Sequence, residues 1–369
     1  MGPPANSPSP PGSGDAAVAS PKSAVGSGNG DELEASAVQN AIEADDTADD
    51  HVDDSASDAA YESDMNSTGS TSVSSSVRDY VFENNRRYHK FQEGRYLLPN
   101  DDAEQEREDM KHAMCVSLCS GKLHMCPLEN PQKILDLGTG TGIWCIDMGD
   151  EYPGAEVIGL DLSPIQPSWV PPNVRFMIDD VETEWVDPPN SLDYVHGRHI
   201  CMTIKNFPRL AAQAYTALKP GGWIELQELR FKIFCDDGSA PEGEGYGYTK
   251  FINLAMAGFR SFGFDPLVME NNKNMLIDAG FVNVEEKIWK VPIGAWPKDR
   301  TMKTIGIYNR SLIMDGLHSV GIKPITKGLG WSEQEVELLL VDVRKALMDA
   351  SNHVYYTFHA VYGQKPGGS

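Results

Sequence analysis

The sequence lacks long apolar runs and any stretch typical of a secretory signal. A helix needs about 20 consecutive apolar residues to cross a bilayer, and no run in this chain approaches that length. The first residues, MGPPANSPSPPG, contain neither a basic start nor an apolar core. We therefore expect an intracellular protein, cytoplasmic or nuclear, with no membrane as a partner.

Basic residues and closely spaced cysteines are also scarce. The 369 residues include 31 lysines and arginines against 54 acids, which gives a formal net charge of −23. Because no basic patch offers the attraction that nucleic acids require, nucleic acid is not an expected partner. Six cysteines are present, but none forms the Cys-x-x-Cys pair typical of a tetrahedral zinc site. We expect buried thiols and no metal.

Large apolar side chains are almost absent from the first part of the chain, residues 1–77. This segment is rich in Ser, Ala, Gly, Pro and Asp, and through residue 75 it contains fourteen acids and one base. Such a segment cannot bury enough surface to offset the entropy of ordering it, which predicts a disordered acidic tail. The tail either keeps the protein soluble or, given the serine run Ser67–Ser76, binds a partner or is phosphorylated.

Aromatic and apolar side chains become frequent after this tail and predict a helical cap over residues 78–130. A helix-start signal at Asn100–Asp102 precedes a helical stripe formed by Met110, Met114 and Leu118. An apolar stripe of this spacing needs a surface to cover. We therefore expect the cap to pack on the main domain.

Buried strands alternate with helical patterns over residues 131–366. The seven strands that we expect are Ile134–Leu137, Val157–Leu160, Val174–Ile178, Leu192–Val195, Trp223–Leu226, Phe281–Val291 and a last one within His353–Pro366. This alternation predicts an α/β domain with a mostly parallel seven-stranded sheet and helices on both faces. A helical insertion over about 296–352 precedes the last strand, and its final helix starts with a capping box of Ser332 and Glu335.

The most informative stretch is Lys133–Trp144, KILDLGTGTGIW, in which an apolar strand ends in Asp136 and three glycines follow. A dinucleotide fingerprint, Gly-x-Gly-x-x-Gly, requires glycine at position 143, where Ile143 stands. A second apolar run ends in Asp161, 23 positions after Gly138. The Asp-x-Gly-x-Gly-x-Gly pattern resembles the S-adenosylmethionine site of Rossmann-like methyltransferases. A purely structural glycine turn would leave Asp161 without a reason.

Each part of S-adenosylmethionine has an expected contact at the carboxyl edge of this sheet. Asp136 can receive the methionine ammonium directly or through water, and the helix after the glycines favours the methionine carboxylate. Asp161 can accept both ribose hydroxyls. Asp180, favoured over Asp179, can receive the adenine amino group. The expected cofactor-binding residues are Asp136, Gly138, Thr139, Gly140, Gly142, Asp161, Leu162, Asp180 and Val181.

Candidate reacting groups follow the fourth and fifth strands, where such sheets hold them. The fourth strand ends in His196, Gly197, Arg198 and His199, and the fifth ends in Glu228. Either histidine or the glutamate could act as a general base, and each could equally be a hydrogen-bonded part of the wall. Arg198 either clamps a substrate carboxylate or pairs with a nearby glutamate. Because methyl transfer needs a base only for some acceptors, the catalytic residue stays open.

Four segments are more specific than the generic fold. They are YHKFQEGRYLLPNDDAEQEREDMKH, the glycine-loop segment through DLSPIQP, LKPGGWIELQE and the closing YYTFHAVYGQKP. Together they resemble the fungal methyltransferases similar to LaeA over roughly residues 80–366. The resemblance implies a class I S-adenosylmethionine-dependent fold with a helical amino-terminal cap. It also implies a role in secondary metabolism, as a tailoring enzyme or as a nuclear regulator.

We expect the chain to methylate a small-molecule acceptor, over which the cap and the insertion could close. The alternative is a regulator that binds S-adenosylmethionine and acts through protein partners, which the acidic serine-rich tail favours. A third alternative is the methylation of protein side chains. Within this resemblance, Thr139 in the glycine loop and the HGRH sequence after the fourth strand depart from LaeA, and both departures are more similar to the enzyme-like relatives than to the regulator.

Overall fold

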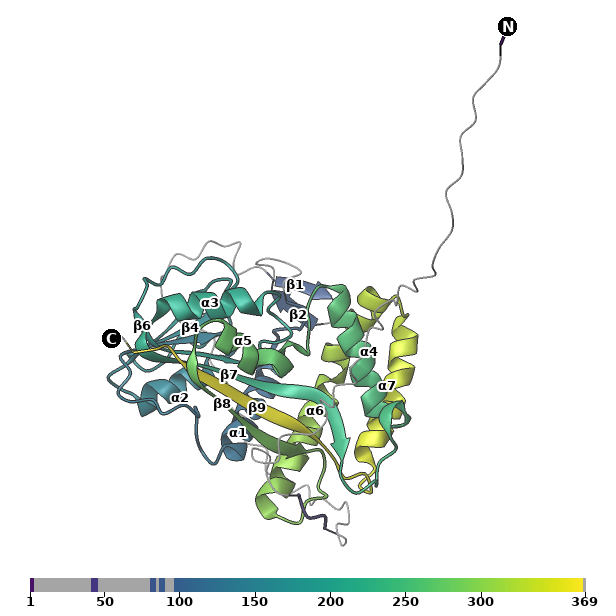
Figure 1. Ribbon diagram of the computed structural model, residues 1–369. Helices are drawn as coiled ribbons and strands as arrows, with labels where there is room; N and C mark the ends of the chain where they lie inside the picture. The colour runs from purple at the N-terminus through teal and green to yellow at the C-terminus, as the bar shows by residue number, and fades with distance from the viewer. Residues whose placement is uncertain (3–40, 46–79, 84–85, 90–95, 368–369) are drawn as a thin grey trace, which may run out of the picture. The chain divides into compact units, whose positions relative to one another are not determined.

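The computed structural model describes residues 1–2, 41–45, 80–83, 86–89 and 96–367. The chain divides into two compact units, Met1–Ala35 and Ser36–Ser369. Every helix and strand that follows belongs to the second unit (Figure 1). Most of the acidic segment 1–77, for which the sequence predicts disorder, lies outside the described residues.

A seven-stranded sheet organises this unit, in the order β5-β4-β3-β6-β7-β9-β8. Its strands are β3 (Lys133–Leu137), β4 (Glu156–Asp161), β5 (Val174–Ile178), β6 (Leu192–Arg198), β7 (Leu218–Cys235), β8 (Val282–Pro292) and β9 (Val354–Gln364). The strands from β5 to β7 are parallel, and β9 runs antiparallel to both β7 and β8. The predicted mostly parallel seven-stranded sheet is confirmed.

The central strand β3 shows why the sheet is covered on both faces. Ile134 packs into one hydrophobic core, whereas Leu135 and Leu137 pack into the other. This alternation is the two-residue period of a strand, and both faces are apolar because both must be buried. Helices α3 (Phe207–Ala217) and α5 (Asn272–Asp278) contribute to the core that contains Leu135.

The helices of the other core include the two that the insertion adds. They are α1 (Asp102–Leu118), α2 (Ile143–Glu151), α4 (Gly247–Ser261), α6 (Arg300–Leu329) and α7 (Glu333–Met348). Of the two short helices, η2 (Gly243–Gly245) precedes α4, and η3 (Val268–Asn271) packs into the core that contains Leu135. Figure 1 shows α4 and α7 side by side, and these two helices are in contact. The predicted helical insertion and the capping box at Ser332 and Glu335 are both present.

The segment before α1 differs from the helical cap that the sequence predicts. It contains an antiparallel hairpin of β1 (Tyr80–Glu83) and β2 (Arg86–His89). Within the described part of residues 78–130, α1 is the only helix. The Arg86 guanidinium binds both carboxylate oxygens of Asp101, the N-cap residue of α1, at 2.5 and 2.9 Å. The hairpin is therefore tied to the start of the helix by a bidentate ion pair, a strong and directional contact.

A short piece of the acidic segment contacts the insertion. Ala44 forms an antiparallel bridge with Pro297, and the Asp45 amide donates to the Trp296 carbonyl at 2.7 Å. Ion pairs of 2.6 Å join Glu43 to Lys298 and Asp45 to Lys303. Residues 41–45 therefore add a strand-like segment to the folded unit, which the prediction of a disordered tail did not include.

The helices that the structure describes are also informative about membranes. None of those in the described ranges combines the length and apolarity needed to cross a bilayer.

Candidate active site

The candidate site lies where the strand order reverses. β3 has β4 on one side and β6 on the other, so the loops that follow these three strands diverge from one edge. In open α/β sheets this crevice, outside the carboxyl ends of the strands, is where ligands bind. The glycine loop, Asp161 and the His196–His199 segment all lie at this edge.

The glycines of the loop between β3 and α2 have two different roles. Gly140 has a φ of +58°, and a Cβ placed there would meet no atom within 4 Å, so its backbone faces open space. Gly142 also has a positive φ, but a Cβ there would lie 2.3 Å from the Phe176 ring. Gly142 therefore permits close packing, whereas Gly140 leaves a cradle that a ligand can approach.

Asp161 closes β4 and orients this loop. Its carboxylate accepts hydrogen bonds from the backbone amides of Gly140 and Ser163, both at 2.8 Å. Burial raises the pKa of Asp161 to about 6. The side chain borders the main cavity. Because a carboxylate has about four acceptor positions, Asp161 can still accept hydroxyl groups of a ligand.

The acids that follow β5 border the same cavity. Asp180 is buried and accepts a hydrogen bond from the Glu182 amide at 2.9 Å, whereas Asp179 is half-buried and accepts from the Asp180 amide at 2.8 Å. Val181 is also buried at the cavity wall. These contacts hold Asp180 within the fold, next to an apolar wall residue.

Asp136 has a partner that the sequence analysis did not predict. One of its oxygens lies 2.7 Å from Nδ1 of His196, and the other accepts from the Cys145 thiol at 3.5 Å. The His196 ring stacks on Trp144, with 3.8 Å between the ring centroids and 6° between the planes. Nε2 of His196 is buried and has no hydrogen-bond partner among the described residues. His196 borders a second, smaller cavity beside the glycine loop.

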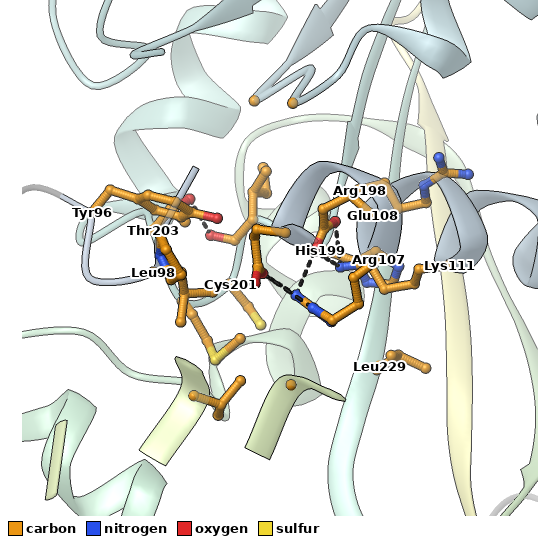
Figure 2. A pocket seen from close by; sticks show the side chains of 18 of the residues that line it. Tyr96, Leu98, Arg107, Glu108, Lys111, Arg198, His199, Cys201, Thr203 and Leu229 are labelled. Atoms are coloured by element: carbon orange, nitrogen blue, oxygen red, sulfur yellow. Dashed lines mark hydrogen bonds and ion pairs between the residues drawn. The ribbon is translucent and has the colours of Figure 1, made fainter. Parts of the chain in front are cut away.

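A row of charged side chains on α1 faces the main cavity. Glu104, Arg107, Glu108 and Lys111 recur at helical spacing, so they share one face of the helix. Arg107 contacts Glu104 and binds Glu108 at 2.7 Å, and Lys111 binds Glu108 at 2.6 Å. Figure 2 shows Arg107, Glu108 and Lys111 close together at the cavity. Although burial raises the pKa of Glu108, Lys111 and Arg107 together hold it below its usual value.

The sequence analysis missed this row, because alternating charges at helical spacing are also typical of a solvated helix face. One signal of its position was available. The row begins at Glu104 in the first turn of α1, and Asp101 caps that turn by accepting from the Glu104 amide at 3.1 Å.

Arg198 pairs with a histidine and not with a glutamate. Its guanidinium lies 2.7 Å from Nδ1 of His112, whose Nε2 lies 2.9 Å from Asp147. A guanidinium can only donate, so Nδ1 of His112 accepts and the imidazole is neutral. Burial lowers the pKa of His112, which agrees with this neutral form.

The three candidate bases lie at different cavities. Glu228 borders the main cavity, His196 borders the smaller one, and His199 borders both. Burial lowers the pKa of His199 well below its usual value and raises the pKa of Glu228 to about 7. One oxygen of Glu228 accepts from the amides of Ile200 and Cys201, at 2.8 and 2.9 Å.

The main cavity is continuous from the glycine loop to the interior between α1, α4 and α6. Its wall includes cofactor candidates of the sheet edge and apolar residues of the helices, and its volume is about 210 Å³. Of the predicted cofactor-binding residues, Gly138, Gly140, Asp161, Leu162, Asp180 and Val181 border this cavity. Asp136, Thr139, Gly138 and Gly140 border the smaller cavity next to it, and Gly142 packs on Phe176.

Comparisons with known proteins agree with this geometry. A family model described as a methyltransferase domain matches residues 107–285. Methyltransferase pytC of Aspergillus terreus is 39% identical over 79% of this chain and 90% of its own length. The secondary metabolism regulator LAE1 of Cochliobolus heterostrophus is 36% identical over 77% of this chain and 94% of its own. The protein-methionine methyltransferase laeA of Emericella nidulans is 30% identical over 77% and 76%, respectively.

Solved structures are similar to this chain only at low identity. A phosphoethanolamine N-methyltransferase of Haemonchus contortus in complex with S-adenosyl-L-methionine is 20% identical, with a TM-score of 0.40, over 70% of this chain and 52% of that one. The sequence relatives, by contrast, match most of both chains at 30–39% identity. The chain therefore belongs to the LaeA-like family of S-adenosylmethionine-dependent methyltransferases.

Proposed function

We propose that this methyltransferase acts on a small-molecule acceptor of secondary metabolism. The observation that carries the proposal is the continuous cavity that runs from Gly140 and Asp161 to the interior between α1, α4 and α6. A cavity of this kind can bring a compact acceptor to the cofactor edge while the surrounding helices exclude water.

The residues at the sheet edge fit S-adenosylmethionine. The open cradle at Gly140 suits its methionine part, Asp161 suits the ribose hydroxyls, and Asp180 suits the adenine amino group. When bound, the cofactor supplies a methyl group on a sulfonium, which is a good leaving group. The task of the chain is to hold an acceptor atom in line with that methyl group, and proximity and orientation contribute ~7–11 kcal/mol in favourable cases.

We propose that His196 connects the Asp136 carboxylate, through a hydrogen bond, to the methionine end of this site. Asp136 can only accept, so the proton of a neutral His196 lies on Nδ1, and Nε2 is left as an acceptor. The methionine ammonium would donate to this buried, unpartnered nitrogen. The N-terminus of α2, which follows Gly142, would favour the methionine carboxylate.

Glu228 is the residue that we propose as the general base. Its pKa of about 7 makes the carboxylate a competent proton acceptor near neutral pH. His199 is the weaker base of the two, because burial lowers its pKa well below the usual value. The proton of an acceptor hydroxyl would pass to the Glu228 carboxylate.

A labelling experiment with cell extract tests the proposal. The purified protein is incubated with methyl-labelled S-adenosylmethionine and an extract of its source cell, and the label is separated by molecular size. The proposal predicts label in the small-molecule fraction. Label on macromolecules, or none despite measurable cofactor binding, contradicts it.

A second candidate is a nuclear regulator that acts through protein partners. The identities of 36% and 30% to secondary metabolism regulators favour it, and so does the acidic serine-rich segment before residue 78. Deletion of residues 1–40 tests it, because this deletion spares the contacts of residues 41–45 with the insertion. A regulator would lose function and nuclear localisation in cells while its cofactor affinity stays unchanged, whereas a cytoplasmic tailoring enzyme would tolerate the deletion.

A further inference from the structure

We propose that the acceptor is an uncharged molecule with an apolar body and a hydroxyl group, bound in the cavity between α1, α4 and α6 with the hydroxyl at Glu228. This inference rests on the proposed function and names its substrate class. Four features of the cavity support it: its paired charges, its apolar walls, the position of Glu228 and a second polar group at Tyr96.

The cationic groups of the cavity wall already have partners. Arg107 is paired with Glu104 and Glu108, and Lys111 is paired with Glu108. Arg198 is hydrogen-bonded to the neutral His112, and its charge also acts on the Glu108 carboxylate. At Arg107 or Lys111, a substrate carboxylate or phosphate would have to replace Glu104 or Glu108 and leave that buried acid uncompensated, which is costly. Within the described residues, the cations at the cavity are therefore already engaged, which disfavours an anionic substrate.

The interior walls are apolar and come from several elements. α6 contributes Leu312 and Leu317, α4 contributes Phe251, α1 contributes Met114 and β7 contributes Leu229, all of them buried and all at the cavity. Binding of an apolar molecule to such a surface is favourable, whereas burial of a charged one there is unfavourable. This wall selects the body of the substrate.

Glu228 supplies an acceptor at the inner wall. Glu228 is 1% exposed, and its carboxyl group accepts from the amides of Ile200 and Cys201 and contacts the Cys201 side chain. The positions that remain suit one hydroxyl donor. A protonated amine would bring a charge into this apolar interior and would not be nucleophilic, so a hydroxyl fits better than an amine.

Tyr96 supplies a second polar group on the other side of the cavity. Its side chain borders the cavity, and a phenolic hydroxyl can donate or accept a hydrogen bond. Figure 2 shows Tyr96 and Leu98 at one side of the cavity and Leu229 at the other. The Tyr96 hydroxyl can therefore bind a neutral oxygen of the substrate, such as a carbonyl, at a distance from Glu228.

Matched probes test the inference by direct binding. The full chain, saturated with S-adenosylhomocysteine, is titrated by calorimetry at pH 7.5 with 2-naphthol, with 6-hydroxy-2-naphthoate and with naphthalene. We expect 2-naphthol to bind at least about tenfold more tightly than the carboxylate, because the carboxylate must displace a buried partner. Naphthalene should bind more weakly than 2-naphthol, because it lacks the hydroxyl. Equal or tighter binding of the carboxylate, or binding of no probe, overturns the inference.

A cavity-filling variant locates the binding. Leu312→Trp should abolish binding of 2-naphthol, since Leu312 is buried at the wall, whereas Leu338→Trp on the exposed face of α7 should leave it unchanged. Unchanged binding in a folded Leu312→Trp variant contradicts the inference. If that variant does not fold, the probe comparison on the unaltered chain still decides.

The extract experiment separates this inference from the proposed function. A labelled small molecule that carries a carboxylate leaves the proposed function standing and overturns the inference. Label on macromolecules alone, together with tight binding of 2-naphthol, overturns the proposed function and leaves the chemistry of the cavity as inferred.

Discussion

Asp136 and His196 form a buried pair, in which the carboxylate of β3 lies 2.7 Å from Nδ1 of the histidine on the neighbouring strand β6. The two residues are directly opposite in the register of the parallel strands. Trp144 covers the histidine ring. We propose that Asp136 acts on the cofactor through His196, whose Nε2 is buried without a hydrogen-bond partner among the described residues.

Replacement of His196 separates the structural and the binding roles of this pair. His196→Phe keeps a ring on Trp144 but leaves Asp136 buried without its partner, so we expect the free energy of unfolding to fall by about 3 kcal/mol. Cofactor affinity should fall by about tenfold, as expected for the loss of one charge-assisted hydrogen bond. Denaturant melts and calorimetry with S-adenosylhomocysteine measure the two effects.

The double variant Asp136→Leu with His196→Phe is the control. Removal of both polar partners should restore most of the stability, while cofactor affinity stays low. If the double variant regains both stability and affinity, the dyad has no role in binding.

Asp161 should contribute more to cofactor affinity than Asp179. Asp161→Ala removes an acceptor of charge-assisted hydrogen bonds, each worth ~1.5–3 kcal/mol, so affinity should fall by roughly ten- to a hundredfold. Asp179→Ala, at the same edge, should change affinity little, and Asp180→Ala should weaken it clearly. Unchanged affinity in folded Asp161→Ala would refute the assignment of the ribose site.

Cofactor affinity should also depend on pH through Asp161. The pKa of this carboxyl is about 6 because of burial, so the group is ionised above that pH and protonated below it. Ribose hydroxyls donate better to the ionised form. Affinity should therefore fall as the pH decreases from 7 to 5, which calorimetry across this range measures. A flat profile contradicts the proposed role.

The rate of methyl transfer should rise with pH through the titration of Glu228. Its pKa is about 7, so the carboxylate that accepts a proton predominates only above neutral pH. Glu228→Gln should lower kcat by about 10²- to 10⁴-fold and remove this rise, with cofactor affinity unchanged. His199→Asn serves as the comparison and should retain the rise. A retained pH profile in Glu228→Gln assigns the proton transfer to another group.

The contact of residues 41–45 with the insertion can be tested by charge reversal. Glu43→Lys or Lys298→Glu should each weaken the packing of residues 41–45 on the insertion by ~0.2–1 kcal/mol, because the ion pair is largely exposed. The doubly reversed variant should regain the contact. Hydrogen exchange at the Asp45 amide, which donates to Trp296, reports it. Faster exchange in the double variant than in either single one would exclude the ion pair as its cause.

The sheet and the glycine loop were predictable because their signals are local. The strand that contains Ile134 and Leu135 is apolar on both faces, and glycines at fixed spacing follow Asp136. The partner of Asp136 requires knowledge of strand order as well. His196 ends the fourth strand, but only the adjacency of β3 and β6 brings the two side chains together.

The place of the hairpin in the fold and the contact of residues 41–45 depend on long-range contacts. Arg86 is tied to Asp101 and to Ser319 of α6, more than 200 positions away in the sequence. Ala44 pairs with Pro297 across a similar separation. Composition favours disorder for an acidic segment, and it gives no sign that five of its residues pair with the distant segment Trp296–Lys298.

The most direct test of the account is the identity of the methylated product. The unaltered chain, Asp161→Ala and Glu228→Gln are each incubated with methyl-labelled S-adenosylmethionine and source-cell extract, and the labelled small molecules are identified by mass spectrometry. The account predicts one uncharged, apolar product with a new O-methyl group, strongly reduced with either variant. Label confined to protein, or an anionic product formed equally by all three chains, would contradict it.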